Sequence, residues 1–276
     1  MKYFDAHSHY THGKFARDRH KLLEEIQKAG VGYVVDCFGT SKAEELEIGL
    51  SLARKYDFFY ICINDFGHYG EVDLRDTAVA AQLIGESITR VKKLREQNKK
   101  IVAYGECYMD FRRTEKTAES LAEQTAWLKA DFAIAKGAGL PVVIHSGNAD
   151  QEAFDVIKDI DMPDYGHGRG MMHSYLGPPQ MALDYIDMGY LISVTGLVTH
   201  RSARGKNLVE VVKRVPLSHM LIETDCPYLT PEPMRDKRND SSLLRLTVKA
   251  IAEIKGVTPQ EVVEVTMANA RALYRI

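Results

Sequence analysis

Eight short apolar runs, separated by stretches of helical character, are the feature that most constrains how this chain folds. Most of the runs are apolar without alternation, which is typical of parallel strands covered on both faces. The runs are Tyr3–Asp5, Val31–Cys37, Phe58–Ile63, Ile101–Gly105, Pro141–Ile144, Gly170–Met172, Tyr190–Val194 and Met220–Ile222. Eight strand-and-helix units in 276 residues take about 34 residues each, which matches one (β/α)8 TIM barrel. We therefore predict a single barrel domain over residues 1–276.

The residues between the runs carry helix signals. Over 117–138, Leu128 and Phe132 fall on one face of a helix. Thr258 and Glu261 have the spacing of a capping box at the start of a C-terminal helix. The alternative architecture, a doubly wound open sheet, would carry a glycine-rich phosphate loop after an early strand, and the sequence has no such motif. The barrel is therefore favoured over the open sheet.

The charge balance limits the partners of the chain. Its 36 basic and 38 acidic residues give a net charge of −2, which disfavours broad coating of nucleic acid but not an enzyme with a locally positive site. The four cysteines form no C-x-x-C pair, the N-terminus has no signal-peptide pattern, and no apolar run approaches the roughly 18 residues of a membrane span. These features predict a cytoplasmic protein with reduced thiols, no membrane contact and no obligate protein partner.

Histidines and carboxylates stand at the C-terminal ends of five predicted strands, where barrel enzymes build their sites. The residues are His7, His9, Glu106, His145, His173 and Asp225. Each has an ordinary explanation on its own, because a lone histidine is usually structural, Glu106 could pair with an arginine, and Asp225 could cap a helix. Residues two apart in an extended segment point the same way, so His7 and His9 can converge on one ion. Their joint occurrence favours a metal site.

The ligand types indicate which ions this site would hold. Imidazoles and carboxylates suit Zn, Mn, Co or Ni, with Mg as a further candidate. Six ligands are too many for one tetrahedral zinc with an open position, and they suit two divalent ions that share a carboxylate. Two carboxylates against two divalent ions leave a local charge of about +2, which would attract an anionic substrate despite the negative chain.

At these residues the sequence resembles the TatD-like metal-dependent deoxyribonucleases, a branch of the amidohydrolase-like barrels. The resemblance covers nearly the whole chain, and its most specific segment is E-T-D-x-P-Y-L at residues 223–229. Further matching segments are D-A-H-S-H at 5–9, L-P-V-V-I-H-S at 140–146, M-H-S-Y at 172–175, S-V-T-G at 193–196, Gly105-Glu106 and Lys237-Arg238-Asn239.

The resemblance implies a role for each matched residue. His7 and His9 would hold one ion with Asp225, Glu106 would bridge to a second ion, and His145 and His173 would complete that second site. Asp225 would also act as the general base, with Glu106 as the other catalytic residue. The expected reaction is attack of a metal-activated hydroxide on the phosphorus of a DNA phosphodiester.

The basic residues after the last strand are the candidates for binding phosphate. Lys237 and Arg238 are expected to contact the substrate, and Arg112 and Arg113 are weaker candidates.

The sequence departs from the family pattern around the mouth of the pocket. Asn64 stands where the family usually has a histidine, so we predict that it contacts the substrate without carrying a proton. His68, four residues on, is a candidate to replace that histidine sterically. Tyr108 adds bulk where glycine is usual, and the loop at 234–241 differs from the family at Asp236. No departure removes a proposed metal ligand, so the metal site is predicted more firmly than the substrate.

Two other functions remain open. The same two-metal site would serve an amidohydrolase or lactonase, or a phosphoesterase of a small substrate, because each uses a metal-bound hydroxide. A metal-holding scaffold without catalysis is the non-enzymatic alternative, and the intact Asp225 argues against it.

Overall fold

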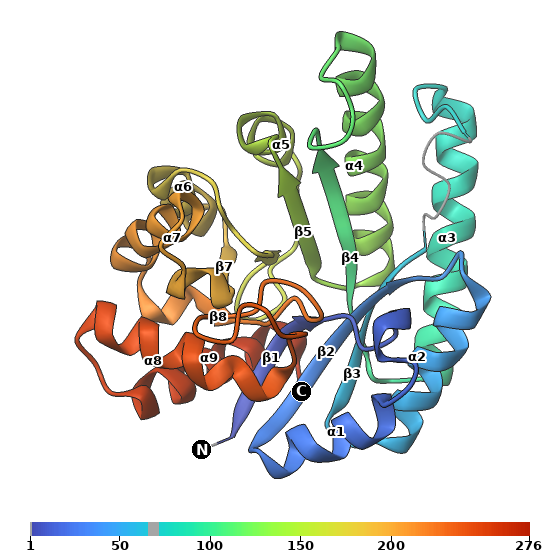
Figure 1. Cartoon of the computed structure of the whole chain (residues 1–276). Coiled ribbons are helices and arrows are strands. Elements are labelled where there is room, and N and C mark those ends of the chain that lie inside the picture. Colours follow the sequence, from blue (N-terminus) through green and yellow to red (C-terminus); the bar gives the residue numbers. More distant parts are fainter. Residues whose placement is uncertain (1, 66–71) are drawn as a thin grey trace.

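The computed structural model describes residues 2–65 and 72–276. Its strands form one sheet of eight parallel strands in sequential order (Figure 1). The strands are β1 (Tyr3–Ser8), β2 (Val31–Gly39), β3 (Phe59–Asn64), β4 (Ile101–Asp110), β5 (Val142–Gly147), β6 (Gly170–Met172), β7 (Tyr190–Val194) and β8 (Met220–Ile222). The predicted (β/α)8 barrel is confirmed.

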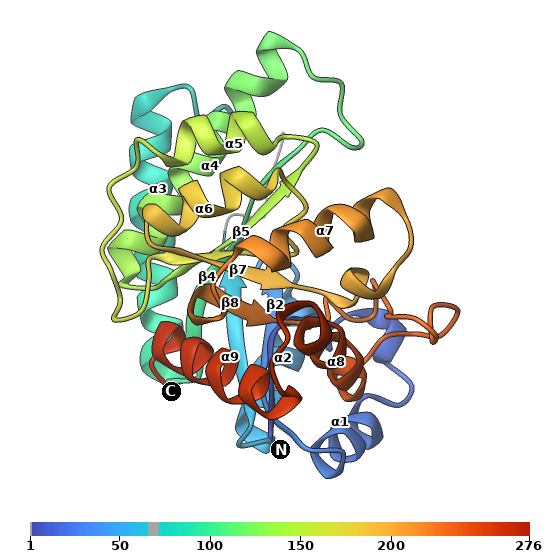
Figure 2. The same cartoon turned by 90° about the vertical axis from the view of Figure 1, so that its left-hand side faces the viewer.

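Helices follow the strands and cover the outside of the sheet (Figure 2). They are α1 (Arg19–Lys28), α2 (Ala43–Lys55), α3 (Thr77–Gln97), α4 (Ala118–Ala138), α5 (Asp150–Ile157), α6 (Pro179–Asp187), α7 (Ala203–Arg214), α8 (Leu244–Lys255) and α9 (Pro259–Tyr274). Short 3-10 turns lie at η1 (Gly13–Phe15), η2 (Gly196–Thr199), η3 (Leu217–His219) and η4 (Ser241–Leu243). As predicted, Thr258 caps α9, because its hydroxyl accepts the backbone N–H of Glu261 at 3.1 Å.

The residues after β8 lie against β1 and bring the two ends of the sheet together. The backbone N–H of Asp225 donates to the carbonyl of His7 at 3.0 Å, and that of His9 donates to the carbonyl of Cys226 at 2.9 Å. Asp225 has a φ of 56°, a left-handed conformation that costs free energy in a residue other than glycine. The hydrogen bond to His7 helps to hold that conformation, so barrel closure also positions the Asp225 side chain.

The interior of the barrel is filled by buried apolar side chains, to which every strand contributes at least one. They include Phe4, Val35, Cys62, Val102, Val143, Met171, Leu191 and Leu221. Leu273 and Tyr274 of α9 pack against this layer, and the ring of Tyr274 stacks on Phe4 with centroids 5.9 Å apart. The end of the barrel away from the strand C-termini is therefore filled, which leaves the C-terminal rim for a site.

The structure also differs in detail from the sequence expectations. Strand β4 continues to Asp110 because it keeps pairing with β5, where Tyr108 lies opposite His145. Glu106 and His145 therefore lie within strands and not after them, as does His7 in β1. His68 lies outside the described residues. Within the described part of the chain, no helix has the length and apolar character needed to cross a membrane.

Candidate metal centre

The six predicted ligands come together at the C-terminal rim of the barrel. Strands β1, β4 and β5 carry His7, Glu106 and His145, while His9, His173 and Asp225 stand just beyond strand ends. Because all eight strands are parallel, their C-terminal ends meet at one rim, and residues more than 200 positions apart become neighbours.

One group of donor atoms surrounds His7 and His9. Their Nε2 atoms are 3.1 Å apart, and Oδ1 of Asp225 lies 3.1 Å from Nε2 of His9. Oε1 of Glu106 lies 3.5 Å from each of the two Nε2 atoms. Two donors that each lie about 2.0–2.2 Å from one ion are themselves about 3–3.5 Å apart. The spacing of these atoms therefore fits a shared metal ion.

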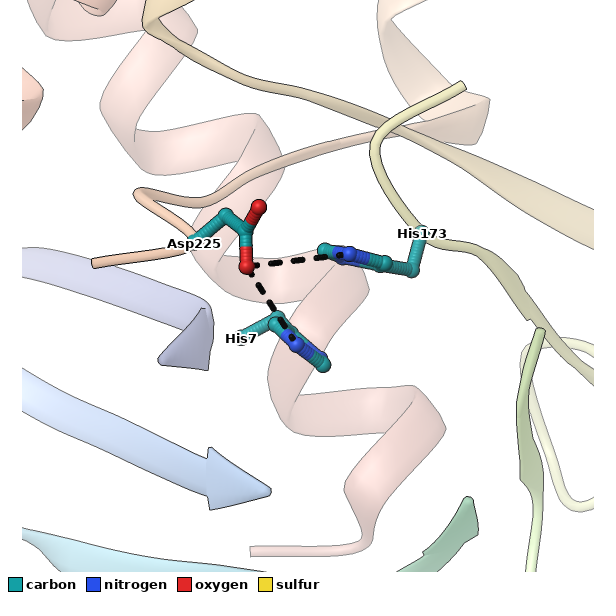
Figure 3. Close-up of side chains that lie close together, drawn as sticks. All are labelled: His7, His173 and Asp225. Atoms are coloured by element: carbon teal, nitrogen blue, oxygen red, sulfur yellow. Dashed lines mark ion pairs between the residues drawn. The ribbon is translucent and has the colours of Figure 1, made fainter. Parts of the chain in front are cut away.

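A second group of donors lies beside the first. Oε2 of Glu106 is 3.4 Å from Nδ1 of His145, and Glu106, His145 and His173 offer ligand atoms within 4.8 Å of one another. Figure 3 shows one Asp225 oxygen facing both His7 and His173, and it lies 3.9 Å from each Nε2 atom. Because its two oxygens face different imidazoles, Glu106 has the arrangement of a bridging carboxylate.

Hydrogen bonds fix which imidazole nitrogen is available to an ion. Nδ1 of His9 donates to the carbonyl of Cys37 at 2.8 Å, which leaves Nε2 of the neutral ring without a proton. Nδ1 of His145 is buried and has no hydrogen-bond partner among the described residues. A buried, unpaired nitrogen beside a carboxylate fits a metal ligand, because leaving it unpaired otherwise costs free energy.

The charges of the cluster are strongly coupled. Burial raises the pKa of Glu106, but His7, His173 and His9 outweigh burial and hold that pKa well below its usual range. Burial lowers the pKa of His9, but Asp225 and Glu106 outweigh it and raise the pKa to about 10. The acids thus favour protons on neighbouring imidazoles, and a divalent cation would compete with these protons.

Glu223 lies beside one of the six predicted ligands, and the sequence analysis gave it no role. Its carboxylate is fully buried, and its Oε1 lies 2.9 Å from Nδ1 of His173 and accepts the backbone N–H of Ser174 at 2.6 Å. Burial lowers the pKa of His173, but Glu223 outweighs it and raises the pKa to about 9. An acid beside the second nitrogen of a ligand histidine orients the ring. The sequence signal that could have identified Glu223 was its position two residues before Asp225.

Asp5 is a second buried acid that the sequence analysis did not assign. Its oxygens accept the backbone N–H of Thr224 at 2.8 Å and the hydroxyls of Thr224 and Ser241, each at 2.6 Å. Burial raises its pKa to about 7. Asp5 therefore connects β1 to the residues after β8 and fixes the backbone next to Asp225.

Arg112, a weaker candidate for phosphate, lies at the edge of the centre. It pairs with Asp110, and its Nη2 lies 2.7 Å from Nε2 of His145. A guanidinium only donates, so it holds the proton of a neutral His145 on Nδ1. An ion on Nδ1 would leave the proton on Nε2, and Arg112 would then have to turn aside, because two N–H donors cannot face each other at 2.7 Å. Oδ2 of Asp110, 3.4 Å away, could accept that proton. Arg113 has no such contact with the centre among the described residues.

The three predicted substrate residues lie in different surroundings. Asn64 lines a cleft of about 230 Å³ with His9 and Glu106, and its amide donates to the carbonyl of Glu106 at 2.9 Å. Lys237 is exposed beside a second hollow. Arg238 forms a bidentate ion pair with Asp18, at 2.9 and 2.6 Å, over the ring of Phe15. Its binding of phosphate stays a prediction that would require this pair to open.

The geometry of the rim can now be compared with known proteins. Residues 4–275 match the family model described as TatD related DNase. The chain belongs to the TatD family. It is 30% identical over 273 residues to the metal-dependent hydrolase YabD of Bacillus subtilis, with 99% of both chains covered. It is 28% identical over 286 residues to the 3'-5' ssDNA/RNA exonuclease TatD of Rahnella sp., with 99% of this chain and 98% of the relative covered.

Solved structures agree with this assignment at the level of the fold. The crystal structure of YJJV, a TatD homolog from Escherichia coli K12, superimposes with a TM-score of 0.80 at 22% identity, covering 99% of this chain and 98% of that one. The predicted family and the predicted class, a metal-dependent hydrolase, are therefore confirmed.

Proposed function

We propose that this TatD-family protein is a two-metal phosphodiesterase that hydrolyses DNA at the centre formed by His7, His9, Glu106, His145, His173 and Asp225. The observation that carries the proposal is the spacing of the donors, with Glu106 facing two groups of imidazoles. His7, His9 and Asp225 would hold one ion, His145 and His173 the other, and Glu106 both. Zn, Mn, Co, Ni or Mg would suit these ligands. When bound, such ions lower the pKa of water and stabilise charge on phosphate oxygens.

The protein's own residues supply orientation and proton transfer. Asp225 is positioned to accept a proton, because one of its oxygens faces the imidazoles while the other turns away from His7 and His173 (Figure 3). Asn64 lies in the cleft beside Glu106 and would contact the substrate next to the scissile bond. Lys237 would meet a phosphate at the rim, since its side chain is exposed there.

Several features support DNA as the substrate and the cytoplasm as the location. The matched family model is described as a DNase, and the Rahnella relative is named an ssDNA/RNA exonuclease. The four cysteines are free thiols, as is typical of a reducing compartment. We further propose that residues 1–276 act as one domain.

Metal analysis combined with parallel assays tests this function. We expect about two equivalents of divalent metal per chain and chelator-sensitive cleavage of 3'-labelled DNA. We expect Glu106→Ala and His145→Ala to lose metal and at least about 100-fold in rate, and Asp225→Asn to lose rate. Lys28→Ala, at the exposed end of α1, is the matched control. Chelator-resistant cleavage, or hydrolysis of a lactone panel in preference to DNA, would contradict the proposal.

A further inference from the structure

A second hollow lies at the C-terminal rim of the barrel. Its volume is about 600 Å³, and it is lined by residues of the segments 197–204, after β7, and 227–237, after β8. We call it the α7 groove. Figure 2 shows the segment between β8 and α8 projecting from the barrel near α1 and α7. The volume falls within the range of about 300–1,000 Å³ found for ligand sites.

The side chains of the α7 groove are basic. Arg204, Arg235 and Lys237 line it, and no carboxylate is among its lining residues. Within the described residues, the side chains of Arg204 and Lys237 form no ion pair, and Arg235 meets Glu232 only at 3.9 Å. Three cations thus gather at one place on a chain whose net charge is −2. Such a concentration of positive charge attracts an anionic polymer.

An exposed aromatic ring stands at the edge of the groove. Tyr228 is 42% exposed, although large apolar rings in this protein are otherwise mostly buried. Nζ of Lys14 lies 4.6 Å from the centre of the ring. An exposed ring beside several cations is typical of surfaces that bind single-stranded nucleic acid, where bases stack on the ring and cations hold the backbone.

Tyr228 connects the groove with the cleft beside the proposed metal centre. Tyr228 comes three residues after Asp225, and its hydroxyl lies 3.3 Å from Nε2 of His12. His12 lines the cleft that also contains His9 and Glu106. Tyr228 therefore stands between the cleft at the metal centre and the α7 groove, so a strand that leaves the centre across Tyr228 reaches the three cations.

We propose that the α7 groove binds a single-stranded polynucleotide beyond the bond that is cut. A base stacks on Tyr228, and Arg204, Arg235 and Lys237 hold the phosphates that follow. A base in a duplex is stacked on its neighbours and is not available to the ring, so the groove selects unpaired strands. This inference rests on the proposed function, and it adds the location and length of the substrate site.

Binding of fluorescent oligonucleotides tests the groove separately from catalysis. The probes are phosphorothioate oligothymidylates of two and six nucleotides, and anisotropy is measured on the metal-loaded protein. We expect the six-nucleotide strand to bind at least about 10-fold more tightly than the two-nucleotide strand. Arg204→Ala and Tyr228→Ala should each remove most of that difference. Arg204→Ala should also reduce the salt slope by about 0.7, as expected for one lost phosphate contact.

Matched variants separate stacking and charge from other causes. Tyr228→Phe keeps the ring and should bind as the wild type does. Lys28→Ala removes an exposed cation at the far end of the barrel and should change nothing. Lys93→Ala tests the other basic hollow, of about 500 Å³, which Arg90 and Lys93 line between α2 and α3.

Four outcomes would overturn the proposal. The first is equal binding of the two strand lengths, and the second is a loss of affinity in Tyr228→Phe equal to that in Tyr228→Ala. The third is a loss of affinity in Lys93→Ala and not in Arg204→Ala. The fourth is binding of a blunt duplex as tight as that of the six-nucleotide single strand. Hydrolysis of bis(p-nitrophenyl) phosphate by the wild type is measured alongside. If this diester is cleaved while the groove variants bind normally, the groove is wrong and the phosphodiesterase stands. If the groove binds single strands tightly but no diester is cleaved, the groove stands and the phosphodiesterase proposal is wrong.

Discussion

At the residue scale, buried polar neighbours orient two of the histidines proposed as metal ligands. His9 is oriented by the carbonyl of Cys37, and His173 by the carboxylate of Glu223. We predict that Glu223→Gln lowers the affinity for divalent metal about 10- to 100-fold, because the negative charge behind His173 is lost while the shape of the side chain is kept. Competition with a chelating dye measures this affinity.

Glu210→Gln is the matched control for Glu223→Gln. Glu210 is exposed on α7 and pairs with Lys213 at 2.7 Å, a contact of little energetic value. The Glu210→Gln variant should bind divalent metal with the affinity of the wild type. Unchanged affinity in Glu223→Gln would mean that His173 needs no acid behind it.

At the scale of elements, α9 completes the barrel from the end opposite the site. The hydroxyl of Tyr274 is buried and donates to the carbonyl of Ala6 in β1 at 2.9 Å. We predict that Tyr274→Phe lowers the free energy of unfolding by about 1 kcal/mol, since the carbonyl loses its donor, and that Tyr274→Ala lowers it by about 3–5 kcal/mol through the cavity left behind. Denaturant unfolding measures both changes.

Tyr33→Phe is the control for the hydroxyl of Tyr274. The ring of Tyr33 also stacks on Phe4, with centroids 5.1 Å apart, but its hydroxyl forms no hydrogen bond with the described residues. We therefore expect Tyr33→Phe to change the free energy of unfolding by no more than about 0.5 kcal/mol. An equal loss of stability in Tyr274→Phe and Tyr33→Phe would contradict the prediction, because it would show that the hydrogen bond from Tyr274 to β1 adds nothing specific.

At the scale of the whole molecule, the proposed metal centre brings together residues from several strands of the barrel. The proposed ligands come from β1, β4, β5 and the segments after β1, β6 and β8, so an ion held by them would oppose unfolding of the whole sheet. Metal at about 100 times its dissociation constant adds roughly 2.7 kcal/mol of stability. We therefore predict that chelation lowers the Tm by roughly 5–10 °C, measured by calorimetry.

Variants of the centre show whether this stabilisation is specific. Glu106→Ala should lose most of the shift, because Glu106 faces both groups of donors. Lys28→Ala should keep it. If metal raised the Tm of Glu106→Ala as much as that of the wild type, binding at another place would explain the stabilisation.

Much of the fold could be predicted from the sequence, and so could the gathering of the six proposed ligands at one rim of the barrel. Parallel strands covered on both faces need continuous apolar runs, so the eight strands were visible, with ends misplaced by a few residues where pairing continued, as in β4. The six proposed ligands could be recognised because histidines and carboxylates recur at the ends of several strands, and the rim of a barrel brings those ends together.

Only the tertiary structure decided which partners the loop residues and the buried acids have. Whether Arg238 faces a phosphate or Asp18 depends on how η1 packs against the residues after β8, and no local pattern encodes that packing. The same holds for Glu223 behind His173 and for Arg204 beside Tyr228, which are brought together by segments far apart in the chain. The sequence by itself determined which strands form and which ligand types end them, because hydrophobic periodicity and residue chemistry are local. The partners of each polar side chain were decided by long-range packing.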